Sequence, residues 1–374
     1  MKYFLIAGEA SGDLHASNLM KGLQAADPEA EFCYMGGDLM KEVSGGMVMH
    51  YRETSYMFLD VLFHLRKIFR NMRLIKNKVL EWKPDVLIPV DYPGFNLRMA
   101  RFASGQGISV FYYISPKVWA WKQRRVNSLK RYVSRLFTIL PFERKFFSGF
   151  DMEVEYFGNP LVDQISVFRE QFEGAEEWRL RHGLDQKPLV ALLAGSRIKE
   201  IETTLPAMLA LAGDHPEYQF VVAGAPSVDS SVYQEYLSGT DLKIVYGETY
   251  ALLASAKAGL VNSGTATLEA ALFELPQVVL YRTSKLAYSI AKRLIKINFI
   301  SLVNLIYGKK LVEEVIQKDL IGRTRKELNR ILKEDSYREE MQEGYRVMKS
   351  ELGEPGVSQR IGARMFELLK AEIE

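Results

Sequence analysis

The sequence predicts an α/β protein made of two successive doubly wound units, each built around a mostly parallel sheet. Short apolar runs alternate with helical patterns along the chain, as strands do when crossover helices join them. A polar stretch rich in glutamate interrupts the pattern near 168–178, and the pattern then restarts. A chain of 374 residues is also too long for one ordinary hydrophobic core and fits two domains.

These observations set the expected domain boundaries. The first domain is expected over 1–168 and the second over 169–352. The last helical segment, about 353–374, is long enough to cross back along the molecule. We expect it to pack on the first domain.

The composition excludes several classes of protein. A net charge of +3 is too small to indicate a nucleic-acid binder, and 48% hydrophobic with 25% charged residues is typical of a folded globular chain. The single cysteine, Cys33, cannot form an internal disulfide, which favours a reducing cytoplasmic compartment. No apolar run reaches the length of a membrane span, so any membrane contact is expected to be peripheral.

The expected strands follow in order along each unit. In the first unit they are 2–7, 32–35, 86–90, 108–114 and 136–140. In the second they are 189–194, 220–223, 243–246, 259–261 and 278–281. Ligands of parallel sheets bind at the carboxyl ends of the strands, so the loops after these strands carry the candidate site residues.

The first strand leads into a glycine-containing loop that opens a helix. Gly12 allows a tight turn, and Asp13 is expected to cap this helix. Ser11 and the unpaired N–H groups of the helix start can receive an anionic group. Because Glu9 and Asp13 are acidic, a sugar hydroxyl suits this loop better than a bare pyrophosphate. We predict that Glu9, Ser11, Gly12 and Asp13 contact a sugar.

The third and fourth strands also end in polar loops. Asp91 stands before a turn that contains Asn96, where a carboxylate acts either as a general base or simply as a turn or cap residue. Ser115 and Trp119 lie in a loop that also holds Trp121 and four cations. This loop is either a cation–aromatic surface patch or faces a ligand, and the strand that leads into it favours a ligand.

A helix over 58–80 has an unusual surface. Its apolar residues recur at three- and four-residue spacing, which predicts a buried stripe, and further apolar residues lie outside that stripe. The rest of its second half is basic and contains no acid: Arg66, Lys67, Arg70, Arg73, Lys76 and Lys78. We predict that this helix lies on an anionic membrane surface or holds an acyl chain. The alternative is a core helix with a solvated basic face.

Two loops of the second unit are suited to a nucleotide. Gly195, Ser196 and Arg197 end its first strand, where an arginine can bind a diphosphate through two hydrogen bonds. Gly247 ends the third strand, and a nucleobase can lie against the backbone there.

The second unit is organised around a strand that turns through small hydroxyl residues into a helix. The unpaired N–H groups and the dipole of this helix start favour a phosphate, and Glu269, one turn further on, is placed to accept hydrogen bonds from a ribose. The alternative is a plain capped helix with a favourably placed acid. The loop lacks the lysine of a Walker motif and the glycine pattern of a dinucleotide fingerprint. The predicted contacts are Ser263, Gly264, Thr265, Ala266, Thr267 and Glu269.

Near the end of the second unit, Glu314 and Gln317 are three residues apart. We expect them on one face of a helix, where an acid and an amide can bind sugar hydroxyls, although solvent exposure is the alternative. The five histidines have no metal-ligand spacing, so no metal site is expected.

In this order, the motifs resemble those of the lipid-A-disaccharide synthase family over nearly the whole chain. The matching motifs are Gly8-Glu9-Ala10-Ser11-Gly12-Asp13, Asp91-x-Pro93-x-Phe95-Asn96, Ser115-Pro116-x-Val118-Trp119-Ala120-Trp121, Leu140-Pro141-Phe142-Glu143, Gly195-Ser196-Arg197, Ser263-Gly264-Thr265-Ala266-Thr267-Leu268-Glu269, and Asn304-Leu305 with Glu314 and Gln317. The resemblance implies a GT-B fold, in which a cleft lies between two Rossmann-like domains. It also implies an inverting glycosyltransferase of lipid A biosynthesis in Gram-negative bacteria. Such an enzyme joins UDP-2,3-diacylglucosamine to 2,3-diacylglucosamine 1-phosphate through a β-1,6 linkage and releases UDP.

The resemblance also implies roles for the candidate residues. The donor nucleotide is expected on the second domain, with Arg197 and the helix start at Ser263 stabilising the departing UDP, and Asp91 acting as the general base. The acceptor is expected to contact the first glycine loop, Asn96, Ser115, Trp119, Asn304, Glu314 and Gln317. No metal or cofactor is expected.

The chain departs from the family pattern at two positions near the expected base. Gly94 stands where the family usually has a second acid, which places a two-carboxylate mechanism in doubt, and Lys117 replaces a small residue beside the tryptophans. Two other functions stay open: an enzyme like UDP-N-acetylglucosamine 2-epimerase, and a non-catalytic nucleotide-binding protein on a membrane. The expected location is the cytoplasmic face of the inner membrane, with no nucleic-acid partner. Whether the chain forms a homodimer stays open.

Overall fold

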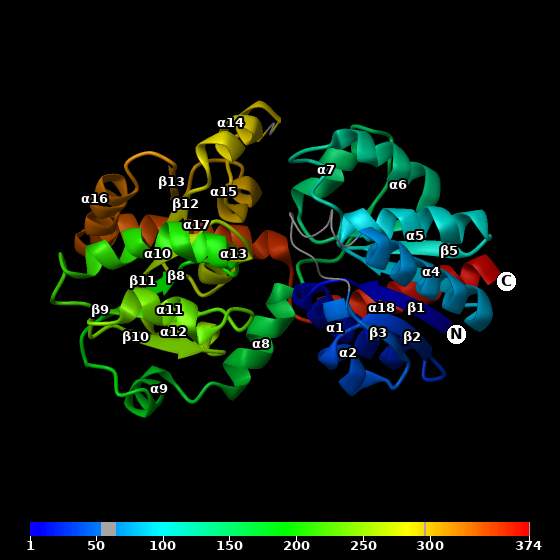
Figure 1. Cartoon of the computed structure of the whole chain (residues 1–374), viewed down its shortest axis with the longest axis horizontal. Helices are drawn as coiled ribbons and strands as arrows, with labels where there is room; N and C mark the ends of the chain where they lie inside the picture. The colour runs from blue at the N-terminus through cyan, green and yellow to red at the C-terminus, as the bar shows by residue number, and fades with distance from the viewer. Residues whose placement is uncertain (54–64, 295–296, 374) are drawn as a thin grey trace. The chain divides into compact units, whose positions relative to one another are not determined.

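The computed structural model describes residues 1–53, 65–294 and 297–373. The chain forms two compact units, Met1–Asp163 together with Gly353–Glu374, and Gln164–Leu352 (Figure 1). It leaves the first unit within α8 (Leu161–Gln171), the helix that also contains the expected boundary at residue 168. It returns after α17 (Asp335–Leu352).

The first unit contains a seven-stranded parallel sheet. Its strand order is β3-β2-β1-β4-β5-β6-β7, so the sheet grows in both directions from β1 and β4, as in a doubly wound fold. The strands are β1 Lys2–Ala7, β2 Glu31–Gly36, β3 Met47–His50, β4 Val86–Val90, β5 Ser109–Tyr113, β6 Arg135–Thr138 and β7 Glu155–Tyr156. The five strands expected from the sequence are confirmed, and β3 and β7 are additional short edge strands.

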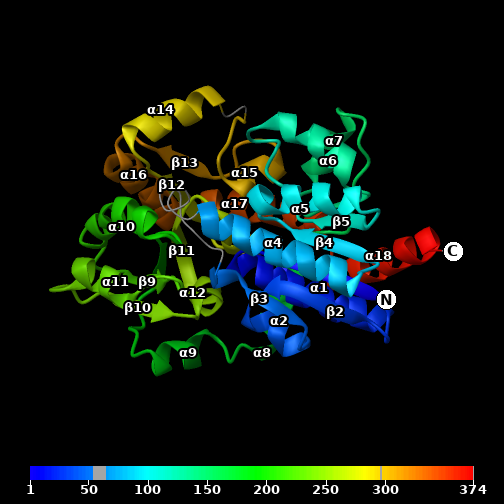
Figure 2. The ribbon, with the colours of Figure 1, turned by 45° about the vertical axis from the view of Figure 1, so that its right-hand side comes forward.

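Helices cover both faces of this sheet. Because side chains alternate along a strand, Tyr3 and Leu5 of β1 pack with α1 and α18 on one face, whereas Phe4 and Ile6 pack with α4 and α5 on the other (Figure 2). The helices are α1 Ala10–Ala26, α2 Asp38–Val43, α4 Leu65–Trp82, α5 Pro93–Gly105, α6 Val126–Tyr132, α7 Phe142–Ser148 and α18 Val357–Ile373, with short 3-10 turns η1 at Tyr51–Glu53 and η2 at Gln123–Arg125.

The C-terminal helix α18 packs closely against α1. At the crossing point, a side chain on Gly22 would place its Cβ 2.4 Å from the Ser358 carbonyl oxygen, and one on Gly362 would meet the Gly22 backbone at the same distance. The two glycines therefore let the helix backbones touch. The N-terminus of α18 is held by Asp163, whose carboxylate accepts hydrogen bonds from the N–H groups of residues 356–358 at 2.7–2.9 Å.

The second unit contains a six-stranded parallel sheet of order β10-β9-β8-β11-β12-β13. The strands are β8 Leu189–Leu193, β9 Gln219–Gly224, β10 Lys243–Tyr246, β11 Ala256–Asn262, β12 Gln277–Tyr281 and β13 Glu313–Ile316. The helices are α9 Ala175–Arg181, α10 Ile198–Ala212, α11 Ser230–Leu237, α12 Thr249–Ser255, α13 Thr265–Leu272, α14 Lys285–Leu294, α15 Leu302–Tyr307, α16 Leu320–Lys333 and α17. Five of these strands were expected from their apolar runs.

The expectation of a helix around Glu314 and Gln317 is wrong. Residues Glu313–Ile316 form β13, which pairs with β12 at the edge of the sheet, and Gln317 follows it with a positive φ of 61°. Glu314 lies within the strand and Gln317 lies beyond its end, so their three-residue spacing does not place them on one helical face.

The basic helix expected over 58–80 is described from Leu65 onward, as α4, and residues 58–64 lie outside the described part of the chain. Met72, Ile75 and Val79 form its buried stripe, and Phe69 and Leu74 outside that stripe are 56% and 50% exposed. Among the described residues, no helix combines the length and apolarity that crossing a membrane requires.

Candidate active site

Asp91 is placed by a sharp turn at the carboxyl end of β4. Asp91 and Tyr92 both have left-handed backbone conformations, with φ values of 43° and 46°, and α5 starts at the next residue. Burial raises the pKa of the Asp91 carboxyl to about 6, the Lys117 ammonium opposes this rise, and the charge of Glu9 adds to it. Asp91 therefore has the raised proton affinity of a general base near neutral pH.

Two neighbouring side chains fix the backbone of Asp91. The buried Asn96 amide nitrogen donates to the carbonyl oxygens of Ile6, Val90 and Asp91 at 3.3, 3.1 and 2.8 Å. The Tyr112 hydroxyl also donates to the Asp91 carbonyl, at 2.6 Å. Asn96 was predicted to contact the acceptor, but its Nδ2 group holds the ends of two strands together. Tyr112 lies inside an apolar strand, where no local pattern marks it as a functional residue.

The first glycine loop divides into exposed and buried residues. Glu9 and Ser11 are exposed, whereas Gly12 and Asp13 are buried. The Asp13 carboxylate accepts hydrogen bonds from the N–H groups of Gly37, Leu39 and Met40 at 2.7, 3.1 and 3.2 Å. The prediction that Asp13 caps its own helix is therefore wrong, because it caps α2 instead. Of the four predicted sugar contacts, Glu9 and Ser11 are the two that solvent reaches.

The loop after β5 is held in place by hydrogen bonds to a buried acid, Glu143. The position of this residue in the sequence did not indicate that role. Glu143 accepts hydrogen bonds from Trp119 Nε1 at 3.1 Å and from the N–H groups of Leu140 and Ile139 at 3.0 and 3.3 Å. Burial raises its pKa to about 7, although these hydrogen bonds oppose the rise. Ser115 and Trp119, predicted acceptor contacts, are 5% and 7% exposed. Trp119 thus anchors the loop, and its neighbours Lys117 and Trp121 are the exposed residues.

In the second unit, the loop of Gly195, Ser196 and Arg197 follows β8 and starts α10. Gly195 has a φ of 122°, and a side chain there would collide with Glu200 and Asn262, so only glycine fits. Arg197 is exposed, and its guanidinium donates to Glu200 at 2.9 Å. Glu200 also accepts from the Ser196 N–H at 3.0 Å. An acid of α10 therefore orders this loop and partners its arginine.

The loop after β11 lies next to this one, because β8 and β11 are paired neighbours with Leu193 opposite Val261. Helix α13 begins after Gly264 without any side-chain cap, so its first N–H groups are available to an anion. The Ser263 hydroxyl donates to the Ile300 carbonyl, and that of the buried Thr267 donates to the Gly264 carbonyl. Thr265 is exposed and Ala266 half-buried. The groups that this loop leaves available to an anion are thus mainly backbone N–H groups.

Glu269 lies one turn into α13 and is paired with a tyrosine that the sequence did not indicate. The Tyr250 hydroxyl donates to Glu269 Oε1 at 3.2 Å. Burial raises the pKa of Glu269, and this hydrogen bond opposes the rise. The pair places a polar, partly shielded acceptor beside the start of α13, as a ribose-binding acid requires.

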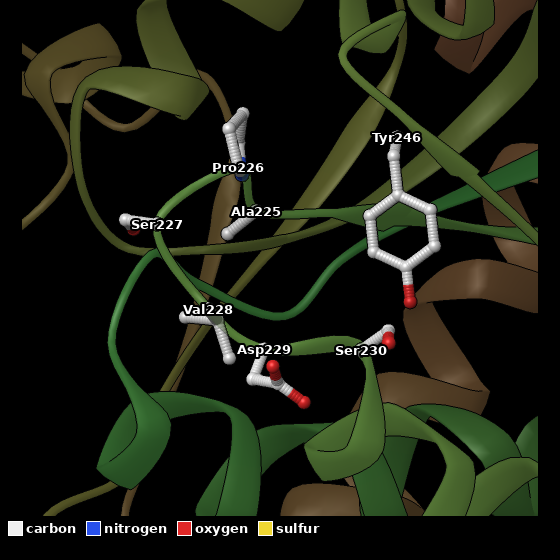
Figure 3. Close-up of a pocket in the computed structure, with 7 residues that line it drawn as sticks. All are labelled: Ala225, Pro226, Ser227, Val228, Asp229, Ser230 and Tyr246. Atoms are coloured by element: carbon white, nitrogen blue, oxygen red, sulfur yellow. The ribbon is translucent and has the colours of Figure 1, made fainter.

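A pocket of about 490 Å³ opens at the carboxyl ends of β9 and β10 (Figure 3). It is lined by Ala225, Pro226, Ser227, Val228, Asp229, Ser230 and Tyr246. Ser227 Oγ donates to the Ser196 carbonyl at 3.1 Å, which joins this pocket to the arginine loop. Gly247, the predicted nucleobase contact, directly follows Tyr246, is exposed and has a φ of 73°.

The remaining predicted sugar contacts use their polar atoms within the chain. Glu314 accepts hydrogen bonds from the Ile300 and Ser301 N–H groups and from the Asn304 amide. Asn304 is fully buried, and its Oδ1 accepts from the N–H groups of residues 311 and 312. The Gln317 side chain forms two hydrogen bonds with the backbone of Thr283: its Oε1 accepts from the N–H group, and its Nε2 donates to the carbonyl oxygen. These three residues hold the edge of the sheet together, and their contact with a sugar stays a prediction.

Within the described ranges 1–53, 65–294 and 297–373, no group of three or more His, Cys, Asp or Glu side chains could hold a metal ion.

The family of this chain follows from its similarity to known proteins. A model of the lipid-A-disaccharide synthetase family matches residues 3–360. The chain belongs to this family. Relatives named lipid-A-disaccharide synthase include one from Myxococcus xanthus, 36% identical over 98% of this chain and 97% of the relative. Another, from Geobacter sulfurreducens, is 33% identical over 100% of this chain and 98% of the relative.

As a lipid-A-disaccharide synthase family member, the chain is a glycosyltransferase, and its fold has well-matched structural neighbours. The UDP-GlcNAc 2-epimerase from Neisseria meningitidis superposes with a TM-score of 0.69 at 14% identity, covering 98% of this chain and 100% of that one. The glycosyltransferase of kitacinnamycin gives a TM-score of 0.62 at 13% identity and covers 98% of both chains. Identities this low show the fold alone, which is GT-B with two Rossmann-like domains. The family match therefore disfavours the epimerase interpretation.

Proposed function

We propose that this synthase divides its substrates between the two units, with the UDP-linked donor sugar on the second and the phosphorylated acceptor sugar on the first. The reaction joins UDP-2,3-diacylglucosamine to 2,3-diacylglucosamine 1-phosphate. The acceptor 6-hydroxyl oxygen forms a bond to the anomeric carbon of the donor as the bond to the UDP oxygen breaks. The anomeric carbon inverts, the hydroxyl proton leaves to a base, and the bonding electrons leave with UDP.

The main support for placing the donor on the second unit is the N-terminus of α13, which no side chain caps. It lies at the end of a strand that pairs with the strand leading to Arg197, and Glu269 with Tyr250 stands one turn away. N–H groups and a helix dipole stabilise the charge that develops on a departing diphosphate, and Arg197 adds a full positive charge. To take this role, the Arg197 guanidinium breaks its ion pair with Glu200 and binds the diphosphate instead. Glu269 accepts the ribose hydroxyls.

Asp91 is the proposed general base for the acceptor hydroxyl. Its raised pKa lies close enough to neutral pH for it to be ionised in the resting enzyme and still accept a proton effectively. Gly94 supplies no second acid on the same turn. Glu9, exposed at the end of β1 and electrostatically coupled to Asp91, is the alternative base.

The test is acceptor-dependent release of UDP by the full-length chain. Purified protein is incubated with UDP-2,3-diacylglucosamine, with and without 2,3-diacylglucosamine 1-phosphate, and UDP and disaccharide are measured. We expect both products in equal amounts only when the acceptor is present. UDP release without acceptor, or epimerisation of UDP-N-acetylglucosamine, would contradict the proposal.

We propose further that α4 anchors the protein peripherally at the cytoplasmic face of the inner membrane. Exposed Phe69 and Leu74 stand among cations, a combination that favours an anionic bilayer surface. Flotation with anionic vesicles should recover the protein. Replacing Arg66, Lys67, Arg70 and Arg73 by Gln should reduce the bound fraction, and an unchanged fraction would refute this anchor.

A further inference from the structure

An exposed tryptophan in the first unit is covered by two cations. Trp121 is 39% exposed, and the Lys122 ammonium nitrogen lies 4.3 Å from the centre of its ring. The Arg125 guanidinium carbon lies 5.9 Å from the same ring. We refer to Trp121, Lys122 and Arg125 as the Trp121 cluster. Cation–aromatic contacts at exposed sites contribute only about 0.5–1 kcal/mol each, so folding stability alone is a weak reason for gathering these charges.

The positive charge of this cluster is not balanced locally. The sequence from Tyr92 to Phe142 contains no Asp or Glu. Within the part of the chain that the structure describes, Lys117, Lys122 and Arg125 form no salt bridge. The charges of Lys122 and Arg125 are therefore available to a ligand of opposite sign, and that of Lys117 also acts on the Asp91 carboxyl.

The cluster is rigidly attached to the sheet. Lys122 has a left-handed φ of 54°, and its carbonyl accepts a hydrogen bond from the Arg125 N–H at 2.9 Å, which closes the turn η2. Two residues before Trp121, the buried Trp119 is held by Glu143. A preorganised loop loses little conformational entropy when it binds a ligand.

The cluster also belongs to the neighbourhood of the proposed base. Strands β4 and β5 pair with Val90 opposite Tyr113, so Asp91 and the loop that carries the cluster leave the same edge of the sheet. Arg125 acts electrostatically on Tyr112, whose hydroxyl bonds to the Asp91 carbonyl, and Lys117 acts on the Asp91 carboxyl itself. Positive charge thus extends from Asp91 to the Trp121 cluster.

We propose that the Trp121 cluster, together with Lys117, binds the phosphate of the acceptor sugar. This inference rests on the proposed function. A phosphate monoester carries about two negative charges at neutral pH and accepts several hydrogen bonds, which suits an arginine and lysines that form no salt bridge among the described residues. The acceptor carries its phosphate on C1 and its reacting hydroxyl on C6, and C1 and C5, which bears C6, are both bonded to the ring oxygen, so the two groups lie close together on one sugar. A phosphate site near the base, on the next strand end, meets that requirement.

The experiment compares two acceptors that differ only in the phosphate. Full-length enzyme is assayed in neutral detergent micelles with 2,3-diacylglucosamine 1-phosphate and with 2,3-diacylglucosamine. In the variant carrying Lys122→Gln and Arg125→Gln, we expect the KM of the phosphorylated acceptor to rise by about tenfold or more, as for loss of charge-assisted hydrogen bonds. The kinetics with the unphosphorylated acceptor should stay within about twofold of wild type. Inorganic phosphate should compete with the phosphorylated acceptor in wild type and more weakly in the variant.

The matched control is Arg131→Gln. Arg131 lies in the same acid-free segment, and its guanidinium carbon is 5.5 Å from the centre of the Tyr132 ring, but it belongs to the last turn of α6 and does not flank Trp121. It should leave both acceptors unaffected. Lys122→Arg keeps the charge, so its KM for the phosphorylated acceptor should stay close to that of wild type. If the double variant does not fold, the single variant Lys122→Gln replaces it in the comparison.

The outcomes separate this inference from the proposed function. If neither acceptor gives a disaccharide with wild-type enzyme, the proposed function fails. If disaccharide forms but the double variant impairs both acceptors equally, the cluster does not recognise the phosphate and the inference is overturned. A defect that occurs only on anionic vesicles, and is absent in neutral micelles, would assign the cluster to lipid headgroups and also overturn it.

Discussion

The two units offer their polar groups in different ways. In the first unit, the ends of β1, β4 and β5 carry charged side chains, and buried residues such as Asn96 and Glu143 hold those ends in position. In the second unit, the ends of β8 and β11 offer backbone N–H groups, and the exposed Arg197 is the cation beside them. The two parallel sheets share the order of their first six strands, but their strand ends thus present different kinds of polar group.

The difference matches the two halves of a glycosyl transfer. Activation of a hydroxyl needs a base with a suitable proton affinity, and the desolvated carboxyl group of Asp91 is the base that we propose. Stabilisation of a leaving diphosphate needs a fixed positive potential, and we propose that the N–H groups at the start of α13 and Arg197 supply it. Substitutions at the proposed base in the first unit should therefore leave UDP binding by the second unit unchanged.

The largest effect is expected from Asp91→Asn, which keeps the shape and removes the proton acceptor. Turnover should fall by about a hundredfold or more, whereas UDP affinity, which we assign to the second unit, should not change. In wild type, kcat/KM should rise with pH up to about 6 and then level off, because the carboxyl group must be ionised. If Asp91→Asn stays active while Glu9→Gln is inactive, the base is Glu9.

The same variant should be more stable than wild type at neutral pH. The folded-state pKa of Asp91 is raised, so ionisation of this carboxyl group costs folding free energy as the pH rises from its ordinary pKa to about 6. The melting temperature of Asp91→Asn should therefore exceed that of wild type at pH 8, with a smaller difference at pH 4.5. An equal difference at both pH values would show that burial of this charge is not the cause.

The second largest effect is expected from Arg197→Ala in the second unit. Loss of a cation that faces the diphosphate in both ground and transition states should weaken UDP binding and lower turnover, the latter by about fiftyfold. Calorimetry measures the affinity for UDP, and steady-state kinetics measure the turnover. Unchanged UDP affinity would mean that Arg197 stays with Glu200 and that the backbone of α13 alone holds the diphosphate.

A smaller effect, on stability rather than catalysis, is expected from Asp13→Ala. It removes the acceptor for three N–H groups at the start of α2 and should lower the unfolding free energy by about 2 kcal/mol, measured by denaturant titration. The acceptor KM should not change. A raised KM without loss of stability would instead restore Asp13 to the sugar-binding residues.

The smallest effect is expected from Glu200→Gln. Glutamine still offers an oxygen to the Ser196 N–H but removes the charge that competes with a diphosphate for Arg197. UDP should bind about threefold more tightly at low salt, and the gain should shrink as salt increases. Weaker binding would show that Glu200 is needed to orient the arginine.

The sequence predicted strands well because their apolar runs are local and long. Residues 86–90 and 243–246 coincide with β4 and β10. It failed where a partner is distant: Asp13 caps a helix whose first bonded N–H is 24 residues away, and Glu143 meets Trp119 at the same separation. It also failed at β13, where an edge strand with half-buried glutamates has the spacing of a helical face. Cap partners and buried acids depend on tertiary packing, which one sequence does not display.

The packing of α18 on α1 also has a consequence for synthesis. The second unit is one continuous segment, so all of it is made before the helix that completes the first unit. Until then, α1 presents Gly22 and the surrounding apolar residues without the helix that covers them. The unit that is begun first on the ribosome is therefore finished last. A nascent chain released before Val357 is expected to contain a folded second unit and an incomplete first unit.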